Sequence, residues 1–191
     1  FLQSNQFITM ASQLTKTQQE FQDTLAECRT LFAKKLHDYG PSWRILRPSS
    51  LTDQLFIKAK RIRSLEITRE SLVGEGIRPE FIALINYSIV GLIQLERGFV
   101  DSVDMTADEA LALYDRYAKQ AYELMLKKNH DYGEAWRDMR TSSYTDLILT
   151  KIERIKEIEN LGGATLVSEG IDSNYMDIMN YAVFGAIKLH E

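Results

Sequence analysis

Hydrophobic residues recur at spacings of three and four through most of the chain, which is the period of amphipathic helices. The pattern predicts six helices, at about 15–39, 50–66, 79–96, 106–131, 143–160 and 172–191. The third of these is apolar on nearly every side, so we expect it to be a buried helix. The fold class that follows is all-α.

Several predicted helix ends carry local signals. Thr17-x-x-Glu20 has the spacing of a capping box, in which side chains satisfy the free backbone N–H groups of a first turn. Gly40 and Gly133 are typical of residues that end a helix. Pro79 is predicted as the first residue of the third helix, because its missing N–H costs nothing at that position.

A short motif occurs twice, 93 residues apart, and contains both tryptophans of the chain. Its copies are Lys35, His37-Asp38-Tyr39-Gly40, Trp43-Arg44 and Lys128, His130-Asp131-Tyr132-Gly133, Trp136-Arg137. Between 35–66 and 128–159, sixteen of thirty-two positions are identical. We therefore predict two three-helix repeats, at 12–97 and 106–191. A tandem of two is too short for an open solenoid, so we expect one compact unit with a pseudo-twofold axis, a symmetry compatible with homodimerisation of the chain.

Composition is ordinary for a globular protein and excludes some partners. The net charge of -4 argues against non-specific binding to nucleic acid, which requires a basic surface. The two most apolar runs, 81–95 and 175–189, are too short and too polar to cross a bilayer, so no membrane partner is expected.

The single Cys28 excludes an internal disulfide framework, and its helical setting predicts a buried thiol in a protein of the cytoplasm. Residues 1–9 lack the features of a secretory signal. The first five, Phe-Leu-Gln-Ser-Asn, resemble the remnant of a cleaved expression tag, so we expect 1–9 to be a leader outside the fold.

Asp131 lies in the last turn of its predicted helix, as Asp38 does in the first repeat. An acid there faces the negative end of the helix dipole, which is unfavourable without a compensating partner. Two interpretations are open. One is a salt bridge to the arginine of the following helix, Arg154 or Arg61. The other is a role in holding a divalent metal or in a phosphate site with Lys128.

Lys151 and Arg154 lie one turn apart on the fifth predicted helix, as Lys58 and Arg61 do on the second. They form either a solvated, salt-bridging face or a pair of cations for phosphate groups, in which arginine provides a bidentate fork. Trp136, like its counterpart in the first repeat, either packs against a helix end or stacks on a nucleobase.

Asp177 and Asn180 are three residues apart, hence on one face of a helix that is otherwise apolar. A carboxylate buried there needs a cation or hydrogen-bond donors, so this pair belongs either to a core network or to a functional site. The first repeat keeps Asn86 but has Ala83 in place of Asp177. We therefore expect the second repeat to hold the better site.

Three further acids lie near the starts of the third helices. Asp172 is predicted to be an N-cap. Glu169 and its counterpart Glu75 occupy equivalent positions in the preceding loops, where they are either electrostatic helix-start residues or metal ligands.

The order Lys, Asp-Tyr-Gly, Trp, Asp, Lys-x-x-Arg-Ile, Glu-x-x-Asp and Asp-x-x-Asn-Tyr resembles the nucleotide-modification-associated domain family. The second repeat matches this order from Lys128 to Tyr181, whereas the first lacks the acids near its third helix. The resemblance covers about 35–96 and 128–191 and implies an all-helical domain associated with nucleotide metabolism or modification. A weaker similarity, carried by Glu169-x-x-Asp172, reaches the all-α (MazG-like) nucleoside triphosphate pyrophosphohydrolases. Those enzymes hold magnesium with a further Glu-x-x-Glu that this chain lacks.

Two functional hypotheses follow. In the first, the protein is a Mg²⁺-dependent enzyme acting on a nucleotide-like small molecule, with the metal held by Asp131, Glu169 and Asp177. The phosphate and nucleotide would be bound by Lys128, Lys151, Arg154, Trp136, Asn180 and Tyr181. The equivalent residues of the first repeat are Lys35, Asp38, Trp43, Lys58, Arg61, Glu75 and Asn86. In the second hypothesis, the protein is a non-catalytic binding or oligomerisation module whose Asp–Arg and Asp–Lys pairs are structural.

Overall fold

The computed structural model describes residues 14–68, 73–162 and 170–190, without the side chains of 73–75. Within these ranges the chain forms six α-helices, two short 3-10 helices and no strand, which confirms the all-α fold of two three-helix repeats. The first repeat contains α2 (Lys16–Tyr39), η1 (Ser42–Ile45), α3 (Pro48–Thr68) and α4 (Val73–Arg97). The second contains α5 (Ala107–Tyr132), η2 (Ala135–Asp138), α6 (Thr141–Asn160) and α7 (Ile171–His190).

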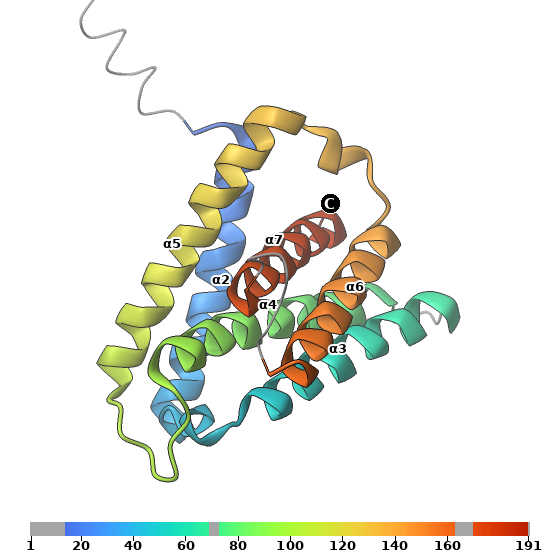
Figure 1. The fold of residues 1–191 in the computed structure, drawn as a ribbon. Helices are drawn as coiled ribbons and strands as arrows, with labels where there is room; N and C mark the ends of the chain where they lie inside the picture. Colours follow the sequence, from blue (N-terminus) through green and yellow to red (C-terminus); the bar gives the residue numbers. More distant parts are fainter. Residues whose placement is uncertain (1–13, 69–72, 163–169, 191) are drawn as a thin grey trace, which may run out of the picture.

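The helices form three layers (Figure 1). The third helices of the repeats, α4 and α7, contact each other most extensively and lie at the centre. The second helices, α3 and α6, pack on one side of this pair and on each other, while the first helices, α2 and α5, pair on the other side. Each layer therefore holds the same helix from both repeats, as a pseudo-twofold axis requires.

The central layer is closed by two matching contacts between a glycine and an aromatic ring. A Cβ atom added to Gly91 of α4 would lie 2.5 Å from the ring of Tyr175 of α7. A Cβ added to Gly185 of α7 would lie 2.8 Å from the ring of Phe81 of α4. Each pair occupies equivalent positions of the two repeats, so the same close approach is made twice.

Two arginines of the duplicated motif tie each repeat to the other. Arg44 donates to Asp104, which directly precedes the second repeat, at 3.1 Å. Arg137 of the second repeat donates to Glu20 of α2 at 2.6 Å and to Thr17 at 3.0 Å. The prediction that Thr17 and Glu20 form a capping box is therefore wrong, because their side chains bind this arginine.

The helix ends agree with the sequence in part. The capping box of α2 is formed by Thr15 and Gln18, two residues earlier than predicted. Gly40 and Gly133 end α2 and α5 with positive φ angles, as predicted. Helix α4 begins at Val73 instead of Pro79, since its additional turn buries Ile77. Helix α7 begins at Ile171, so Asp172 lies in the first turn and is not the N-cap.

Burial bears on two further predictions. Burial raises the pKa of Cys28 to about 12, as expected for an inert core thiol. The stretch Gly76–Arg97 is long and apolar enough to cross a membrane, but 67% of its most apolar window is buried inside the bundle, as in the core helix of a globular protein. The predicted leader at 1–9 lies outside the described residues.

The central crossing can be tested by substitution. Gly91→Ala and Gly185→Ala should each lower the free energy of unfolding by about 1–3 kcal/mol, because the new methyl group must displace an aromatic ring. Urea denaturation followed by circular dichroism measures the change. Ser88→Ala is the control on α4: the Ser88 hydroxyl is buried and makes no hydrogen bond within the described residues, so its loss should cost little. Wild-type stability in both glycine variants would contradict the close crossing.

Candidate functional site

A pocket of about 580 Å³ lies in the first repeat, bordered by α2, η1, α3 and α4. Most of its wall is apolar, with Phe32, Tyr39, Trp43 and Tyr87 as the aromatic members. Its polar lining consists of Lys35, Ser42, Lys58, Glu80 and Asn86. Small-molecule sites usually combine these features: a concave, mainly apolar surface and a few placed polar groups.

The charged groups of this pocket are not balanced. Glu80, buried on α4, accepts a hydrogen bond from Arg61, and its second oxygen lies 3.5 Å from Lys58 Nζ. Lys35, exposed on the last turns of α2, has no ion-pair partner within the described residues. The pocket wall thus carries two lysines and one carboxylate, and Arg61 also pairs with that carboxylate, which leaves the pocket with excess positive charge.

Asn86 of the pocket wall is held in place by the neighbouring helices. Its amide nitrogen donates to the Cys28 carbonyl at 3.2 Å, and its amide oxygen accepts from the Tyr114 hydroxyl at 2.8 Å. Burial raises the pKa of Tyr114, so this hydroxyl keeps its proton. The second repeat therefore contributes, through α5, a hydrogen bond that orients a residue of the first repeat's pocket.

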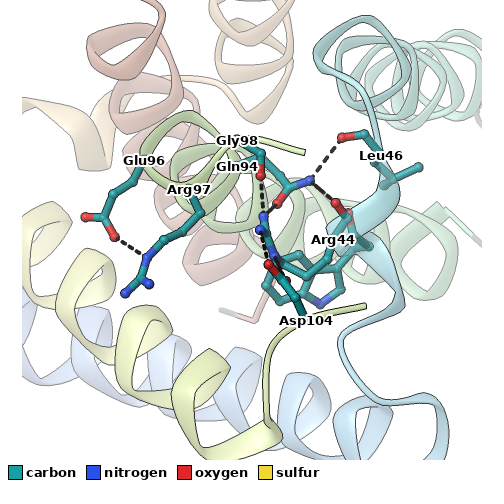
Figure 2. A network of polar contacts seen from close by, with 8 residues as sticks. Arg44, Leu46, Gln94, Glu96, Arg97, Gly98 and Asp104 are labelled. Carbon is teal, nitrogen blue, oxygen red and sulfur yellow. Dashed lines mark hydrogen bonds and ion pairs between the residues drawn. The ribbon is translucent and has the colours of Figure 1, made fainter. Parts of the chain in front are cut away.

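The segment that carries Trp43 is fixed by a buried polar network (Figure 2). The Gln94 amide nitrogen donates to the carbonyls of Trp43, Arg44 and Leu46, at 3.2, 2.8 and 3.0 Å. Arg44, only 2% exposed, donates in turn to the Gln94 side chain and to the Gly98 carbonyl. Because Gln94 of α4 binds three backbone carbonyls of the segment 43–46 in this way, the Trp43 ring is placed at the pocket by a rigid support.

In the second repeat the equivalent lysines are already neutralised. Lys128 Nζ lies 2.7 Å from one oxygen of Asp177, and Lys151 Nζ lies 3.0 Å from the other. The Asp177 side chain is 18% exposed and occupies the position of Ala83 in the first repeat. The expectation that a carboxylate on this helix needs a cation is confirmed, and two lysines supply the charge.

Trp136 is also engaged within the protein. Its ring is 6% exposed and stacks on Phe184, with centroids 4.4 Å apart and an interplanar angle of 18°. In the first repeat the position of Phe184 is taken by the smaller Val90, and Trp43 stays half-buried beside the pocket.

Asn180 differs from Asn86 in its hydrogen bonding. It is 4% exposed, and neither atom of its amide has a partner among the described residues. Phe21 stands at the position that Tyr114 holds in the other repeat, so it packs on Phe184 but offers no hydroxyl. Tyr181, the next candidate residue, packs near Tyr144 with ring centroids 6.4 Å apart.

The acids predicted to bind metal are not gathered in the part of the chain that is described. Asp131 is exposed and lies 3.4 Å from its neighbour His130, while both oxygens of Asp177 contact lysines. Glu169 and the Glu75 side chain lie outside the described residues. The described part of the chain contains no group of three or more His, Cys, Asp or Glu side chains placed to hold a metal ion.

Of the two interpretations of Asp38 and Asp131, the salt bridge to the arginine of the following helix is wrong. Asp38, like its counterpart, is exposed and lies beside the preceding histidine, His37, at 3.2 Å. Arg61 pairs with Glu80 instead, and Arg154 pairs with Glu157 at 3.2 Å.

Sequence reasoning overlooked Glu80 and the importance of small residues at 83 and 90. Glu80 could have been found as an acid that directly precedes the apolar run 81–95, at the position where the second repeat has Asn174. The exchange of Val90 for Phe184 carries no chemical signal, because both residues are apolar.

A larger hollow of about 790 Å³ lies between α4, α5, α6 and α7. The charged residues on its wall are both acids, Glu96 and Asp172. It is therefore poorly suited to an anionic ligand, and the first repeat's pocket is the better candidate.

The fold and site define an all-α tandem-repeat protein with a ligand-sized pocket in its first repeat. The family model of nucleotide modification associated domain 1 matches residues 35–95 and 128–189, more than half of the chain, and the chain belongs to this family. Each match lies within one structural repeat and covers the end of its first helix together with its second and third helices. No curated protein and no solved structure matches the chain, and the MazG-like resemblance gains no support from these comparisons.

The network that holds Trp43 gives a prediction. Arg44→Ala should lower the free energy of unfolding by about 3 kcal/mol, because it leaves the buried Gln94 oxygen and Gly98 carbonyl without a donor. Urea denaturation monitored by tryptophan fluorescence measures the loss. Arg47→Ala is the matched control: Arg47 is exposed and pairs with Asp101, so its removal should cost less than about 1 kcal/mol. Equal effects of both substitutions would contradict the role of Arg44.

Proposed function

We propose that the protein binds a nucleotide in the pocket of the first repeat. The observation that carries the proposal is a pocket that joins an unpaired lysine, Lys35, to a half-buried tryptophan, Trp43. A volume of about 580 Å³ suits a ligand of nucleotide size. Aromatic rings bind the flat face of a nucleobase, and lysine ammonium groups bind phosphate as point charges.

Each part of the pocket has a role in this proposal. Lys35 and Lys58 bind phosphate oxygens, Trp43 and Tyr87 contact the base, and Asn86 offers a fixed amide at the wall. Arg61 and Lys58 compensate the charge of Glu80, the acid of the pocket wall. The name of the family supports a ligand of the nucleotide class. We propose the cytoplasm as the compartment, in agreement with the free thiol of Cys28.

The proposal concerns binding, and turnover is a separate question. Magnesium, expected at Asp131, Glu169 and Asp177, stays a prediction. Titrations with and without Mg²⁺, combined with an assay for released phosphate, distinguish a Mg²⁺-dependent hydrolase from a binding module.

Binding is tested by calorimetric titration with AMP, GMP, CMP, UMP, their 2′-deoxy counterparts and the corresponding nucleosides. At least one nucleotide should bind, more tightly than its nucleoside. Lys35→Ala should weaken that binding roughly tenfold, because a charge-assisted contact to phosphate is lost. Lys34→Ala removes the same charge from the adjacent exposed position, which does not line the pocket, and should leave the affinity unchanged. No binding of any nucleotide, or equal loss in both variants, would overturn the proposal.

A further inference from the structure

We infer that Asp177 occupies, in the second repeat, the subsite that receives the anionic group of the ligand in the first. The chain would then contain one open pocket and one pocket filled by its own side chains. This inference rests on the proposed function and specifies where the phosphate binds and how many ligands one chain holds.

The first step is the equivalence of the cations. Lys35 and Lys58 correspond to Lys128 and Lys151 in the two repeats, on the same helices and at the same positions. In the second repeat both ammonium groups converge on one carboxylate, at 2.7 and 3.0 Å. The backbone frame is repeated, so the lysine pair of the first repeat can converge on one anionic group in the same way.

The second step is the missing carboxylate. Ala83 stands where the second repeat has Asp177, and it lines the pocket. The acid of the first repeat, Glu80, lies one turn earlier on α4, where it reaches Lys58 and Arg61. Lys35 is therefore left without the partner that Asp177 gives to Lys128.

The third step is the space beside the tryptophan. Phe184 stacks on Trp136 and buries it, whereas Val90 is too small to cover Trp43 in the same way. A base stacked near Trp43 would take the place that the Phe184 ring fills in the second repeat. Two side chains of the second repeat thus correspond to the two ends of a nucleotide: Asp177 to the phosphate and Phe184 to the base.

The fourth step is the unused amide. Asn180 is buried with no hydrogen bond from either amide atom within the described residues, although the equivalent Asn86 is fully engaged at the wall of the open pocket. In the filled pocket this amide group therefore has no hydrogen-bond partner among the described residues. It would become available to a ligand if the pocket were opened.

A single carboxylate satisfies both lysines of the second repeat, so the subsite accepts one anionic group at a time. The ligand of the first repeat should accordingly be a nucleoside monophosphate, or a longer nucleotide of which one phosphate enters the subsite.

The test exchanges the distinguishing residues between the repeats. Calorimetric stoichiometry is measured with the tightest of the eight nucleoside monophosphates, and circular dichroism verifies that each variant is folded. The wild type should bind one molecule per chain. Ala83→Asp should weaken binding at least tenfold relative to Ala83→Asn, which adds similar volume without charge. Asp177→Ala combined with Phe184→Val should raise the stoichiometry to two, whereas Asp177→Asn, which keeps the space filled, should leave it at one.

The outcomes separate the inference from the proposed function. Wild-type binding that depends on Lys35 but is reduced equally by Ala83→Asp and Ala83→Asn overturns the inference while nucleotide binding stands. The same holds if the double variant is folded and still binds one molecule. If the wild type binds none of the nucleotides, both are overturned. The Ala83 pair decides the question even if the double variant does not fold.

Discussion

The close crossing of α4 and α7 is the contact on which the rest of the molecule depends. Gly91 against Tyr175 and Gly185 against Phe81 let the two third helices approach more closely than any residue with a Cβ would allow. Because α3 and α6 pack on this pair from one side and α2 and α5 cover the other, its geometry sets both repeats at once. The arginines of the duplicated motif then connect the repeats: Arg44 binds Asp104 in the segment before α5, and Arg137 binds Glu20 of α2.

A symmetric frame allows the two copies to differ in what they enclose. The lysine pair, the tryptophan and the asparagine are kept in both repeats, whereas two of the positions beside them carry different residues, Ala83 against Asp177 and Val90 against Phe184. Asp177 and Phe184 satisfy the lysines and the tryptophan internally in the second repeat. Their smaller counterparts, Ala83 and Val90, leave the first repeat with a pocket and an unpaired charge. Stability and ligand binding can in this way be divided between two copies of one unit.

The fold could be predicted from the sequence because the spacing of hydrophobic residues indicates each helix locally, and the identities between the two halves of the chain indicate the repeat. The stops at Gly40 and Gly133 were predictable for the same reason, since a positive φ angle favours glycine. The cap of α2 was not, because Thr15-x-x-Gln18 and Thr17-x-x-Glu20 both have the spacing of a capping box. The side chains of Thr17 and Glu20 bind Arg137, which follows Thr17 by 120 residues, and the box forms at Thr15. Helix α4 likewise begins before Pro79, the start that local preference predicts, and its added residues include the buried Ile77.

The candidate site was harder to predict. The sequence identified the lysines, the tryptophans and the polar pair on α7, but favoured the second repeat because it has more acids. The structure shows that the Asp177 carboxylate is paired with lysines and that the pocket lies in the repeat where Ala83 stands at the position of Asp177. Charge compensation between helices and the volume left by Ala83 and Val90 are properties of the packed structure, and single positions in a sequence do not report them.

The two tryptophans provide the most direct test of the central claim, that the first repeat is open to a nucleotide and the second is filled. Protein labelled with 5-fluorotryptophan should give two ¹⁹F resonances, which Trp43→Phe and Trp136→Phe would assign. On titration with the tightest-binding nucleoside monophosphate, the Trp43 resonance should shift in a saturable manner while the Trp136 resonance stays in place. A shift of the Trp136 resonance alone, or equal shifts of both, would contradict the account.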